Sequence, residues 1–324
     1  MRVAVTGASG HLGNVVCRQL IHRGYEVNAL YNSDKRGLHG VDVKLFQGSI
    51  LDEELLKEFL KGCDFLVHCA AIISIHGDPD GRVKKTNIEG VKTVLACAVD
   101  AEVKKIIHVS STHAVMEVPL NEPMEEDRPY KQDNDFAYDH SKAVGEQIML
   151  KAFKNGDIDG CVVRPSCIIG EYDFKPSEMG KALLDLKKGK IPVLPPGGYN
   201  FVNVKDVADA MINAIEHGQN GEAYFLTNKY YEIKEIAGFV KEITCRRKPK
   251  FRLSFGVMKF LLPFVKFWGK ITQSAPVFTT ESIMALKNGH PNIINRKAKK
   301  DLKLNSSPIK NTIKEFFDWQ KAKE

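Results

Sequence analysis

The sequence lacks the features that mark several classes of protein. Its seven cysteines are odd in number and form no CxxC pair, and His68, His76 and His113 match no metal-ligand spacing, so we expect neither a disulfide framework nor a metal site. No stretch of 18 or more residues is uninterruptedly apolar, so we expect no membrane-spanning helix. The chain starts directly in a strand-like run at residues 3–5, which predicts no secretory leader and a reducing, cytoplasmic location.

Acidic residues are scarce in one part of the chain only. The 324 residues are 43% apolar and 27% charged, as is typical of soluble globular proteins, and the net charge of +7 is a weak indication of nucleic-acid binding. Residues 1–240 contain 28 Lys and Arg against 34 Asp and Glu, a net charge of −6. Residues 241–324 contain 19 against 6, a net charge of +13, so the last quarter presents a different surface.

Short apolar runs alternate with amphipathic helical patterns over the first 227 residues. This alternation predicts an α/β fold with a doubly wound parallel sheet, because strands that are apolar on consecutive residues are buried on both faces. The expected strands are 2–6, 26–30, 43–46, 65–69, 106–110, 161–164 and 223–226. The expected helices are 12–23, 53–60, 86–100, 138–154 and 204–216.

A glycine-rich turn follows the first expected strand. The segment TGASGHLG places Gly7, Gly10 and Gly13 between this strand and the next helix. Glycine permits the tight bend and lets a pyrophosphate reach the backbone N–H groups at the helix start, where the helix dipole favours an anion. The spacing alone is a weak signal, but the strand before it and the helix after it strengthen it. The sequence therefore predicts a dinucleotide-binding site.

The dinucleotide site suggests a division of the chain into two domains. We expect a dinucleotide-binding Rossmann domain in residues 1–172, completed by about 201–227. Residues 173–200 are rich in proline and glycine, and helices dominate after residue 228. We therefore assign 173–200 and 228–324 to a smaller, mostly helical C-terminal substrate-binding domain.

The end of the second strand indicates which dinucleotide binds. An acidic residue there would hold the ribose 2′-hydroxyl of NAD, whereas a basic residue would accept the 2′-phosphate of NADP. The strand ends in Tyr31-Asn32, and Asp34, Lys35 and Arg36 follow. We expect Asn32, Lys35 and Arg36 to contact the cofactor, and we favour NADP(H) over NAD(H). The alternative is that Lys35 and Arg36 are a solvated pair of loop charges.

The segment YDHSK opens a later helix and suggests proton transfer. It places Tyr138 and Lys142 four residues apart, on one face of that helix. An ammonium about 4 Å from a phenol favours the phenolate by ~4 kcal/mol at an effective dielectric constant near 20, which would lower the pKa of the phenol toward neutrality. The preceding strand ends in HVSST, at the edge of the sheet where ligands bind. We therefore expect Thr112 to hold a substrate oxygen that Tyr138 protonates.

Together these segments resemble the extended short-chain dehydrogenase/reductase family of NAD(P)-dependent epimerases, dehydratases and reductases, and in particular its dihydroflavonol-reductase-like branch. The resemblance covers about the whole chain, and the order of the segments makes it specific. The matching segments are TGASGHLG (6–13), DFLVHCAA (64–71), NIEG (87–90), HVSST (108–112), YDHSK (138–142), VVRPSCIIG (162–170) and FVNVKDVADA (201–210).

The resemblance implies roles for individual residues. The catalytic set would be Thr112, Tyr138 and Lys142, with Asn87 supporting a proton-relay water, and Lys142 would also hold the nicotinamide ribose. Ser49 and Ile50 stand where relatives often carry Asp and an aliphatic residue, so the adenine contact expected there departs from the family pattern. The remaining cofactor contacts would come from Gly7, Gly10, His11, Leu12, Gly13, Ala70, Ala71, Pro165 and Ser166, beside Tyr138 and Lys142.

Residues that the family uses on nucleotide sugars are missing. Dehydratases follow the catalytic threonine with Asp-Glu, whereas Thr112 is followed by His113-Ala114. Epimerases commonly carry Asn and Arg where this chain has Cys167 and Tyr199. We therefore expect an NAD(P)H-dependent reductase of a ketone or aldehyde, or the corresponding alcohol dehydrogenase. A nucleotide-sugar epimerase is one alternative. A non-catalytic NADP(H) sensor is another, although such sensors have usually lost the tyrosine–lysine pair.

The family also implies a homodimer. We expect the helices 86–100 and 138–154 to form the dimer interface.

The segment 251–268 is open to several roles. Its sequence, FRLSFGVMKFLLPFVKFW, combines aromatic and basic residues, and we expect Pro263 to break or kink any helix there. Its apolar side fits a pocket wall for an apolar substrate, a small-domain core or a membrane-facing patch. We favour a protein without membrane contact and without a nucleic-acid partner.

Overall fold

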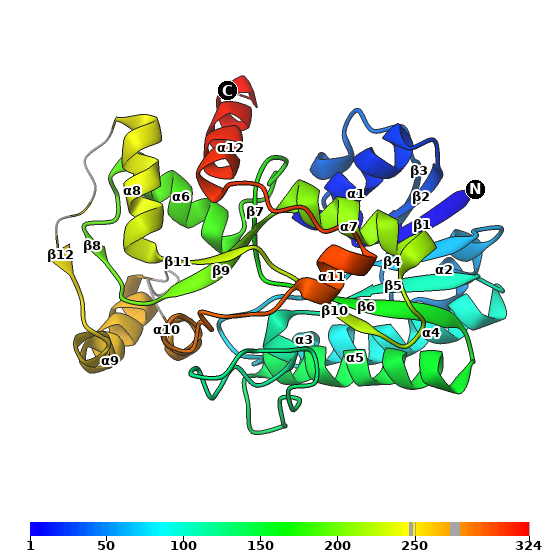
Figure 1. Ribbon diagram of the computed structural model, residues 1–324, viewed down its shortest axis with the longest axis horizontal. Helices are drawn as coiled ribbons and strands as arrows, with labels where there is room; N and C mark the ends of the chain where they lie inside the picture. The colour runs from blue at the N-terminus through cyan, green and yellow to red at the C-terminus, as the bar shows by residue number, and fades with distance from the viewer. Residues whose placement is uncertain (246–248, 250, 273–278, 324) are drawn as a thin grey trace.

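A parallel sheet forms the centre of the molecule (Figure 1). The computed structural model describes residues 1–245, 249, 251–272 and 279–323, with side chains described except for 265–272. The seven strands of the sheet are β1 (Arg2–Thr6), β2 (Glu26–Tyr31), β3 (Lys44–Gln47), β4 (Phe65–His68), β5 (Lys105–Val109), β6 (Asp159–Pro165) and β10 (Ala223–Leu226). Their order is β10-β6-β5-β4-β1-β2-β3, and all their pairings are parallel. The chain reverses its direction across the sheet between β1 and β4, where open α/β sheets bind ligands.

The predicted fold class is confirmed. Each predicted strand is present, with ends that differ from the prediction by no more than two residues. The prediction worked because these strands are buried on both faces, so their apolar residues are consecutive. In β5 all five residues are buried, including Lys105, whose Nζ donates a hydrogen bond of 2.6 Å to the carbonyl oxygen of Gly218.

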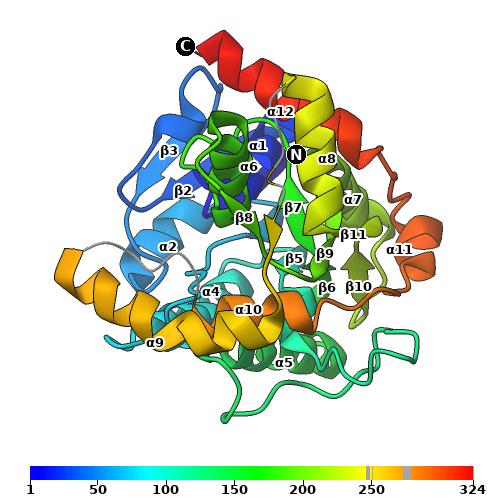
Figure 2. The ribbon, with the colours of Figure 1, turned by 90° about the vertical axis from the view of Figure 1, so that its left-hand side faces the viewer.

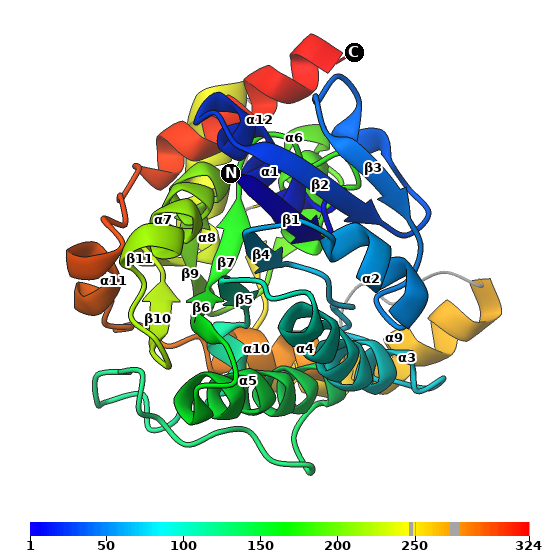
Figure 3. The same ribbon diagram turned by 90° about the vertical axis from the view of Figure 1, so that its right-hand side faces the viewer.

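Helices cover both faces of this sheet (Figure 3). On one face, α1 (His11–His22) packs against α7 (Val204–His217), and on the other lie α2 (Glu53–Leu60), α4 (Gly90–Asp100) and α5 (Ala137–Asn155). Successive residues of a strand point to opposite faces. Val3 and Val5 therefore belong to the apolar core under α1 and α7, whereas Ala4 belongs to the core under α2, α4 and α5.

The predicted helix 86–100 starts earlier and less regularly than expected. It begins as α3 (Arg82–Lys84), widens into a π-helical turn over Lys85–Glu89 and continues as α4. On the helices 86–100 and 138–154, which we expect at a dimer interface, the apolar side chains of Val91, Val94 and Ala152 are buried within this one chain. The predicted homodimer would therefore have to use the half-buried residues Ile88, Leu95, Val144 and Ile148.

A smaller part of the molecule lies beyond the carboxyl ends of the strands (Figures 1 and 2). Its three-stranded sheet has the order β11-β9-β7, and β12 pairs with β8. Its helices α6, α8 and α12 share an apolar core around Leu183, Phe201 and Phe316. The elements are β7 (Cys167–Ile169), α6 (Glu178–Lys188), β8 (Val193–Leu194), β9 (Gly198–Asn203), β11 (Lys229–Glu232), α8 (Ile233–Thr244), β12 (Phe251–Arg252), α9 (Phe255–Thr272), α10 (Thr280–Lys287), α11 (Arg296–Asp301) and α12 (Ile309–Lys323). All except β7 fall at least partly in the segments that we assign to the substrate domain. Of these elements, α11 packs on β10 and α7 of the larger part.

The segment 251–268 is helical on both sides of Pro263. The helix α9 continues through Pro263, so a break, one of the two expected effects of this proline, does not occur, whereas a kink stays a prediction. A proline removes one backbone hydrogen bond, and a helix that packs against a neighbour tolerates this loss; here α9 packs against α10. The side chains of Lys266, Phe267 and Trp268 lie outside the described residues. Among the described helices, none combines the length and hydropathy that crossing a bilayer requires.

Candidate active site

The glycine-rich turn between β1 and α1 has the close packing that its sequence predicts. Gly7 has a positive φ of 63°, and a Cβ on Gly13 would lie 2.2 Å from the carbonyl oxygen of Gly7. A Cβ on Gly10 would meet that oxygen at 3.2 Å, so this position is less restricted. The helix α1 begins after Gly10 without a side-chain cap and without an acidic residue in its first turn. Its backbone N–H groups and its dipole therefore favour an anion at this end.

A cavity of about 760 Å³ opens at the carboxyl ends of β1, β4, β5 and β6. It begins at the glycine turn and extends past the start of α5 to α10. Most of the predicted site residues line it. They are Gly7, Gly10, His11, Leu12, Gly13, Asn32, Ser49, Ile50, Ala70, Ala71, Thr112, Tyr138, Lys142, Pro165 and Ser166. We call the part lined by residues 7–13, 32–34 and 48–50 the nucleotide half, and the part lined by residues 112–139, 167, 199 and 284–293 the substrate half.

Three predicted site residues, Lys35, Arg36 and Asn87, are not among the described residues that line this cavity. The guanidinium of Arg36 binds the carboxylate of Asp34, with 2.7 Å between Nη2 and Oδ2, and this pairing lowers the pKa of Asp34 to about 2. Asp34 itself lines the nucleotide half. The loop therefore presents a carboxylate to the cavity where the sequence suggested cationic side chains.

Asn87 lies behind the cavity wall in the π-helical turn. Its Oδ1 accepts a hydrogen bond from the backbone nitrogen of Ile72 at 2.8 Å. Its Nδ2 donates to the carbonyl oxygen of Ile72 at 3.0 Å and to Oγ of Ser141 at 3.0 Å. Asn87 thus joins the loop after β4, which contains Ala70 and Ala71, to the helix α5, which contains Tyr138.

Tyr138 and Lys142 reach the cavity from the first turns of α5, as predicted, but their electrostatics differ from the expectation. Burial raises the pKa of Tyr138 to about 12, although a hydrogen bond with Ser111 opposes the rise. Lys142 donates a hydrogen bond of 2.6 Å from Nζ to the carbonyl oxygen of Val109, and burial lowers its pKa to about 8. The predicted lowering of the phenol pKa by Lys142 is therefore not seen, because loss of solvent dominates at this buried site.

Ser111 is a site residue that the sequence analysis missed. It is buried, lines the cavity and shares a hydrogen bond with the phenol of Tyr138. Its neighbour Thr112 also lines the cavity and begins a short 3₁₀ turn, Thr112–Ala114. HVSST contains three adjacent hydroxyl residues, and only the conformation after β5 shows which of them reaches the phenol.

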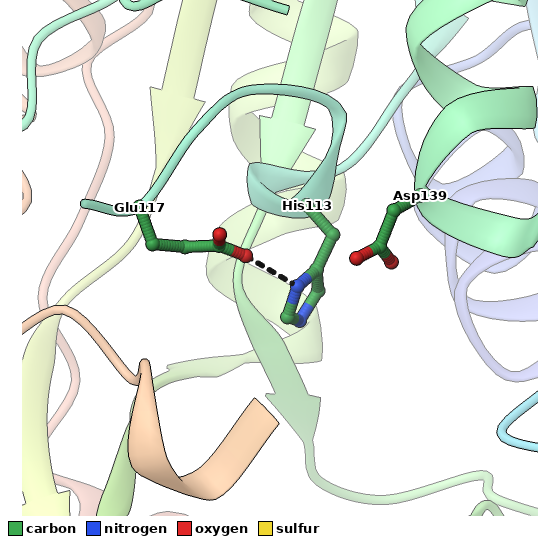
Figure 4. A group of neighbouring side chains, drawn as sticks. All are labelled: His113, Glu117 and Asp139. Carbon is green, nitrogen blue, oxygen red and sulfur yellow. Dashed lines mark hydrogen bonds and ion pairs between the residues drawn. The ribbon is translucent and has the colours of Figure 1, made fainter. Parts of the chain in front are cut away.

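A cluster of ionisable residues, in which Glu117, Lys131 and Asp139 are buried and His113 is half-buried, forms one wall of the substrate half (Figure 4). Nδ1 of His113 lies 3.0 Å from Oε1 of Glu117, and Nζ of Lys131 lies 2.5 Å from the other oxygen of Glu117. Asp139 approaches the imidazole from the opposite side, and His113, Glu117 and Asp139 each offer an atom within 4.8 Å of the others. These residues come from the turn after β5, the loops that follow it and the start of α5, so their proximity is not visible in the sequence.

The cluster shifts the pKa values of its members in opposite directions. Burial disfavours the charge on Glu117, but His113 and Lys131 outweigh it and lower the pKa of Glu117 to about 2. Burial raises the pKa of Asp139 to about 6, and Glu117 adds to that rise. Burial also disfavours the charged form of His113, but the hydrogen bond to Glu117 prevails and raises the pKa of the imidazole. Proton-exchanging groups thus lie beside Tyr138. Lys131 already neutralises Glu117, which argues against a cation in this cluster.

The cavity fits a dinucleotide. A Cβ on Gly7 or Gly13 would collide with backbone atoms at 2.8 Å and 2.2 Å, so the turn leaves its surface bare for close approach of a pyrophosphate. The hydroxyls of Ser110 and Ser166 are buried at the cavity and have no hydrogen-bond partner among the described residues. A buried hydroxyl without a partner is costly, so a polar ligand that reaches these serines would remove that cost.

The sequence matches a family model, and the comparisons with individual proteins agree with it. The model of the "NAD dependent epimerase/dehydratase family" matches residues 3–227. A sterol demethylase protein B of Methylococcus capsulatus is 30% identical over 89% of this chain and 89% of its own length. A 4-hydroxy-2-methyl-3-oxo-4-farnesyl-3,4-dihydroquinoline-1-oxide ketoreductase of Stigmatella aurantiaca is 33% identical over 70% of this chain and 68% of its own length.

The further comparisons confirm the predicted branch and the fold. A dihydroflavonol 4-reductase of Callistephus chinensis is 24% identical over 74% of this chain and 72% of its own length. The crystal structure of the protein gox2253 superposes on 99% of this chain and 98% of its own with a TM-score of 0.86 and 27% identity. A UDP-glucose 4-epimerase of Thermotoga maritima covers 100% of both chains with a TM-score of 0.82 and 21% identity, and that similarity concerns the fold alone.

Proposed function

We propose that this chain, which belongs to the NAD-dependent epimerase/dehydratase family of extended short-chain dehydrogenases/reductases, is an NAD(P)H-dependent oxidoreductase. Its substrate is a ketone or aldehyde, or in the reverse direction the corresponding alcohol. One observation carries the proposal: Thr112, Tyr138 and Lys142 line the same cavity as the glycine turn. A hydride donor held by the turn and an acid held by α5 would therefore face one substrate.

The residues of the substrate half supply orientation and a proton. A bound nicotinamide cofactor supplies the hydride. Thr112 and Ser111 donate hydrogen bonds toward the carbonyl oxygen, and the phenol of Tyr138 transfers its proton to that oxygen as the alcohol forms. A phenol with a pKa raised to about 12 is fully protonated at neutral pH, which suits reduction. Lys142, whose Nζ donates a hydrogen bond to the carbonyl oxygen of Val109, would hold the nicotinamide ribose.

The proposal includes a preference for NADP(H) over NAD(H). Lys35 and Arg36 follow β2, at the position where a 2′-phosphate would lie. The carboxylate of Asp34 works against this preference, because it lines the cavity and holds Arg36. The preference is therefore small, and it depends on release of Arg36 from Asp34.

A nucleotide-sugar epimerase is the alternative function on this scaffold. Two cavity residues favour the reductase: Cys167 and Tyr199 occupy the positions where epimerases commonly have Asn and Arg. Burial raises the pKa of Cys167 to about 12 and raises that of Tyr199 as well, so neither offers charge to a diphosphate. One of the relatives is a ketoreductase by name, which agrees with the same choice. Retention of Tyr138 and Lys142 disfavours a non-catalytic NADP(H) sensor.

The test compares net cofactor consumption with sugar interconversion. Purified protein is mixed with NADPH or NADH and a panel of aldehydes, hydroxyketones and steroid ketones, and separately with UDP-sugars. We expect carbonyl-dependent loss of the 340-nm absorbance, absent in Tyr138→Phe. Interconversion of a UDP-sugar without net cofactor loss would replace the reductase with the epimerase. Cofactor binding without turnover of either panel would favour the sensor.

A further inference from the structure

The surface of β12 and α9 carries exposed aromatic residues. Phe251 of β12 is 73% exposed, and on α9 Val257, Phe260 and Phe264 are 44%, 71% and 61% exposed. The three α9 residues are spaced i, i+3 and i+7, so they share one face of the helix. The rings of Phe260 and Phe264 touch at 5.9 Å between centroids. We call Phe251, Val257, Phe260 and Phe264 the α9 patch.

The α9 patch belongs neither to the cavity nor to the apolar core. Met258, on another side of the helix, is buried. The helix α9 therefore has one apolar side that faces the protein and a second, formed by the patch, that faces solvent. None of the patch residues lines the described cavity, so the patch does not form the pocket wall that was one of the roles considered for the segment 251–268. Large exposed apolar side chains that gather on one face mark an interaction site.

The charge of the surrounding chain identifies the kind of partner. Between Glu242 and Glu281 the sequence has no acidic residue and eight basic ones, of which Arg252 and Lys259 are exposed among the described residues. A second copy of this chain would bring two basic patches together across a two-fold axis, which disfavours self-association through α9. Aromatic and aliphatic side chains beside Lys and Arg match a phospholipid surface with anionic headgroups.

We propose that the α9 patch docks the protein on the surface of an anionic phospholipid membrane. Phe251, Phe260 and Phe264 enter the boundary between headgroups and acyl chains, while Arg252 and Lys259 pair with lipid phosphates. The helix lies in the plane of the surface and does not cross it, in agreement with the absence of a spanning helix among the described residues. α9 packs on α10, and Met284 and Ala285 of α10 line the cavity. Docking therefore brings the substrate half close to the lipid, where apolar carbonyl compounds dissolve.

The test is cosedimentation of the full-length protein with vesicles. One set consists of phosphatidylcholine alone, and the other of phosphatidylcholine mixed with phosphatidylglycerol. We expect binding to the mixed vesicles only, weakened by salt because headgroup attraction is screened. Phe260→Ser/Phe264→Ser should weaken binding by at least about tenfold, and Lys259→Glu should weaken it less and reduce its salt dependence.

Matched variants keep the test specific. Leu45→Ser/Val99→Ser changes two exposed apolar residues away from α9, and Lys300→Glu changes an exposed lysine of α11; both should bind like the unaltered chain. Circular dichroism confirms folding of each variant. Three outcomes would overturn the proposal: no binding to mixed vesicles at low salt, equal binding by Phe260→Ser/Phe264→Ser, or association only with a single-stranded polynucleotide. Dimerisation that these Phe substitutions abolish, seen by light scattering without vesicle binding, would reassign the patch to a subunit interface.

Discussion

The two halves of the cavity differ in the chemistry that they offer. In the nucleotide half, Gly7 and Gly13 expose backbone, and the first turn of α1 has no acidic side chain. In the substrate half, His113, Glu117 and Asp139 are packed around one point with Lys131 beside them. The first half recognises a ligand by shape and by backbone dipoles, and the second by ionisable side chains. A change of protonation near pH 6 should therefore affect the second half more than the first, where burial lowers the pKa of His11 and Arg36 lowers that of Asp34 to about 2.

The two halves also make different demands on the residues that form them. The glycine turn needs a missing side chain, which a larger residue blocks directly. The charged cluster needs a balance, in which the neighbours of Glu117 keep it ionised and burial raises the pKa of Asp139 to about 6. Substitutions should consequently act on affinity for the dinucleotide in one half, and on turnover and pH dependence in the other.

The largest difference between the effect on turnover and the effect on cofactor affinity is expected for Tyr138→Phe. Loss of the phenol hydroxyl removes the proton donor and should lower turnover by about 10²- to 10⁴-fold. Cofactor affinity should change little, because the phosphates lie in the nucleotide half. Single-turnover kinetics and NADPH titration measure the two effects. Residual activity above a few per cent of the unaltered protein would show that another group supplies the proton.

Glu117→Gln and Asp139→Asn should change stability in opposite directions at pH 7.5. The folded pKa of Glu117 is about 2 against an ordinary value of 4.5, so its stabilisation is present above pH 4.5 and is lost as the pH falls through 2. The folded pKa of Asp139 is about 6 against 3.8, so its ionisation destabilises the folded state above pH 6 and is absent below 3.8. Each shift corresponds to about 3 kcal/mol.

We therefore expect Glu117→Gln to lower the free energy of unfolding and Asp139→Asn to raise it, by up to about 3 kcal/mol each. Urea denaturation at pH 7.5 and at pH 4 measures both. The gain from Asp139→Asn should nearly vanish at pH 4, whereas part of the loss from Glu117→Gln should persist there. Changes of the same sign at pH 7.5 would mean that the two carboxylates share one environment.

Gly13→Ala should act on the nucleotide half alone. Its Cβ would lie 2.2 Å from the carbonyl oxygen of Gly7, and relief of such an overlap costs about 1–3 kcal/mol, or roughly 5- to 150-fold in cofactor affinity. The matched control is Gly238→Ala, because a Cβ on Gly238 meets nothing within 4 Å. Calorimetric titration with NADPH compares the two. Equal affinities in the two variants would show that the turn yields to the methyl group.

The smallest effect is expected at the loop after β2, where Asp34 borders the nucleotide half. Lys35→Ser/Arg36→Ser should weaken NADPH binding by less than about tenfold and leave NADH binding unchanged, since exposed charge pairs contribute about 1 kcal/mol or less. Asp34→Asn, which frees Arg36, should strengthen NADPH binding relative to NADH. Equal losses for both cofactors would indicate a damaged loop, and no change in either variant would exclude ribose recognition by this loop.

The sequence was sufficient for the parts of the site that depend on local geometry. The strand before Gly7 and the helix after Gly13 are close in the chain, and Tyr138 and Lys142 lie one helical turn apart, so the local sequence with its flanking elements predicts where they lie. The His113–Glu117–Asp139 group was not predicted, because loops of irregular structure bring its members together. The pKa of Tyr138 was predicted in the wrong direction, since burial at the cavity wall is a property of the whole fold. Pro263 was expected to break or kink its helix, and α9, which packs against α10, is not broken there.

The late position of α10 has a consequence for synthesis. The strands and turns that line the nucleotide half precede residue 70, whereas the substrate half is completed by Met284 and Ala285. The wall near these residues is tied to the rest by the hydrogen bond from Asn200 to His290 and by the bridge between Met124 and Ile293. Because a chain emerges from the ribosome amino end first and folds in that order, the nascent protein should acquire a nucleotide site before a substrate site. We expect stalled or prematurely terminated chains that fold to bind dinucleotide while lacking turnover, so they would compete with the finished enzyme for cofactor.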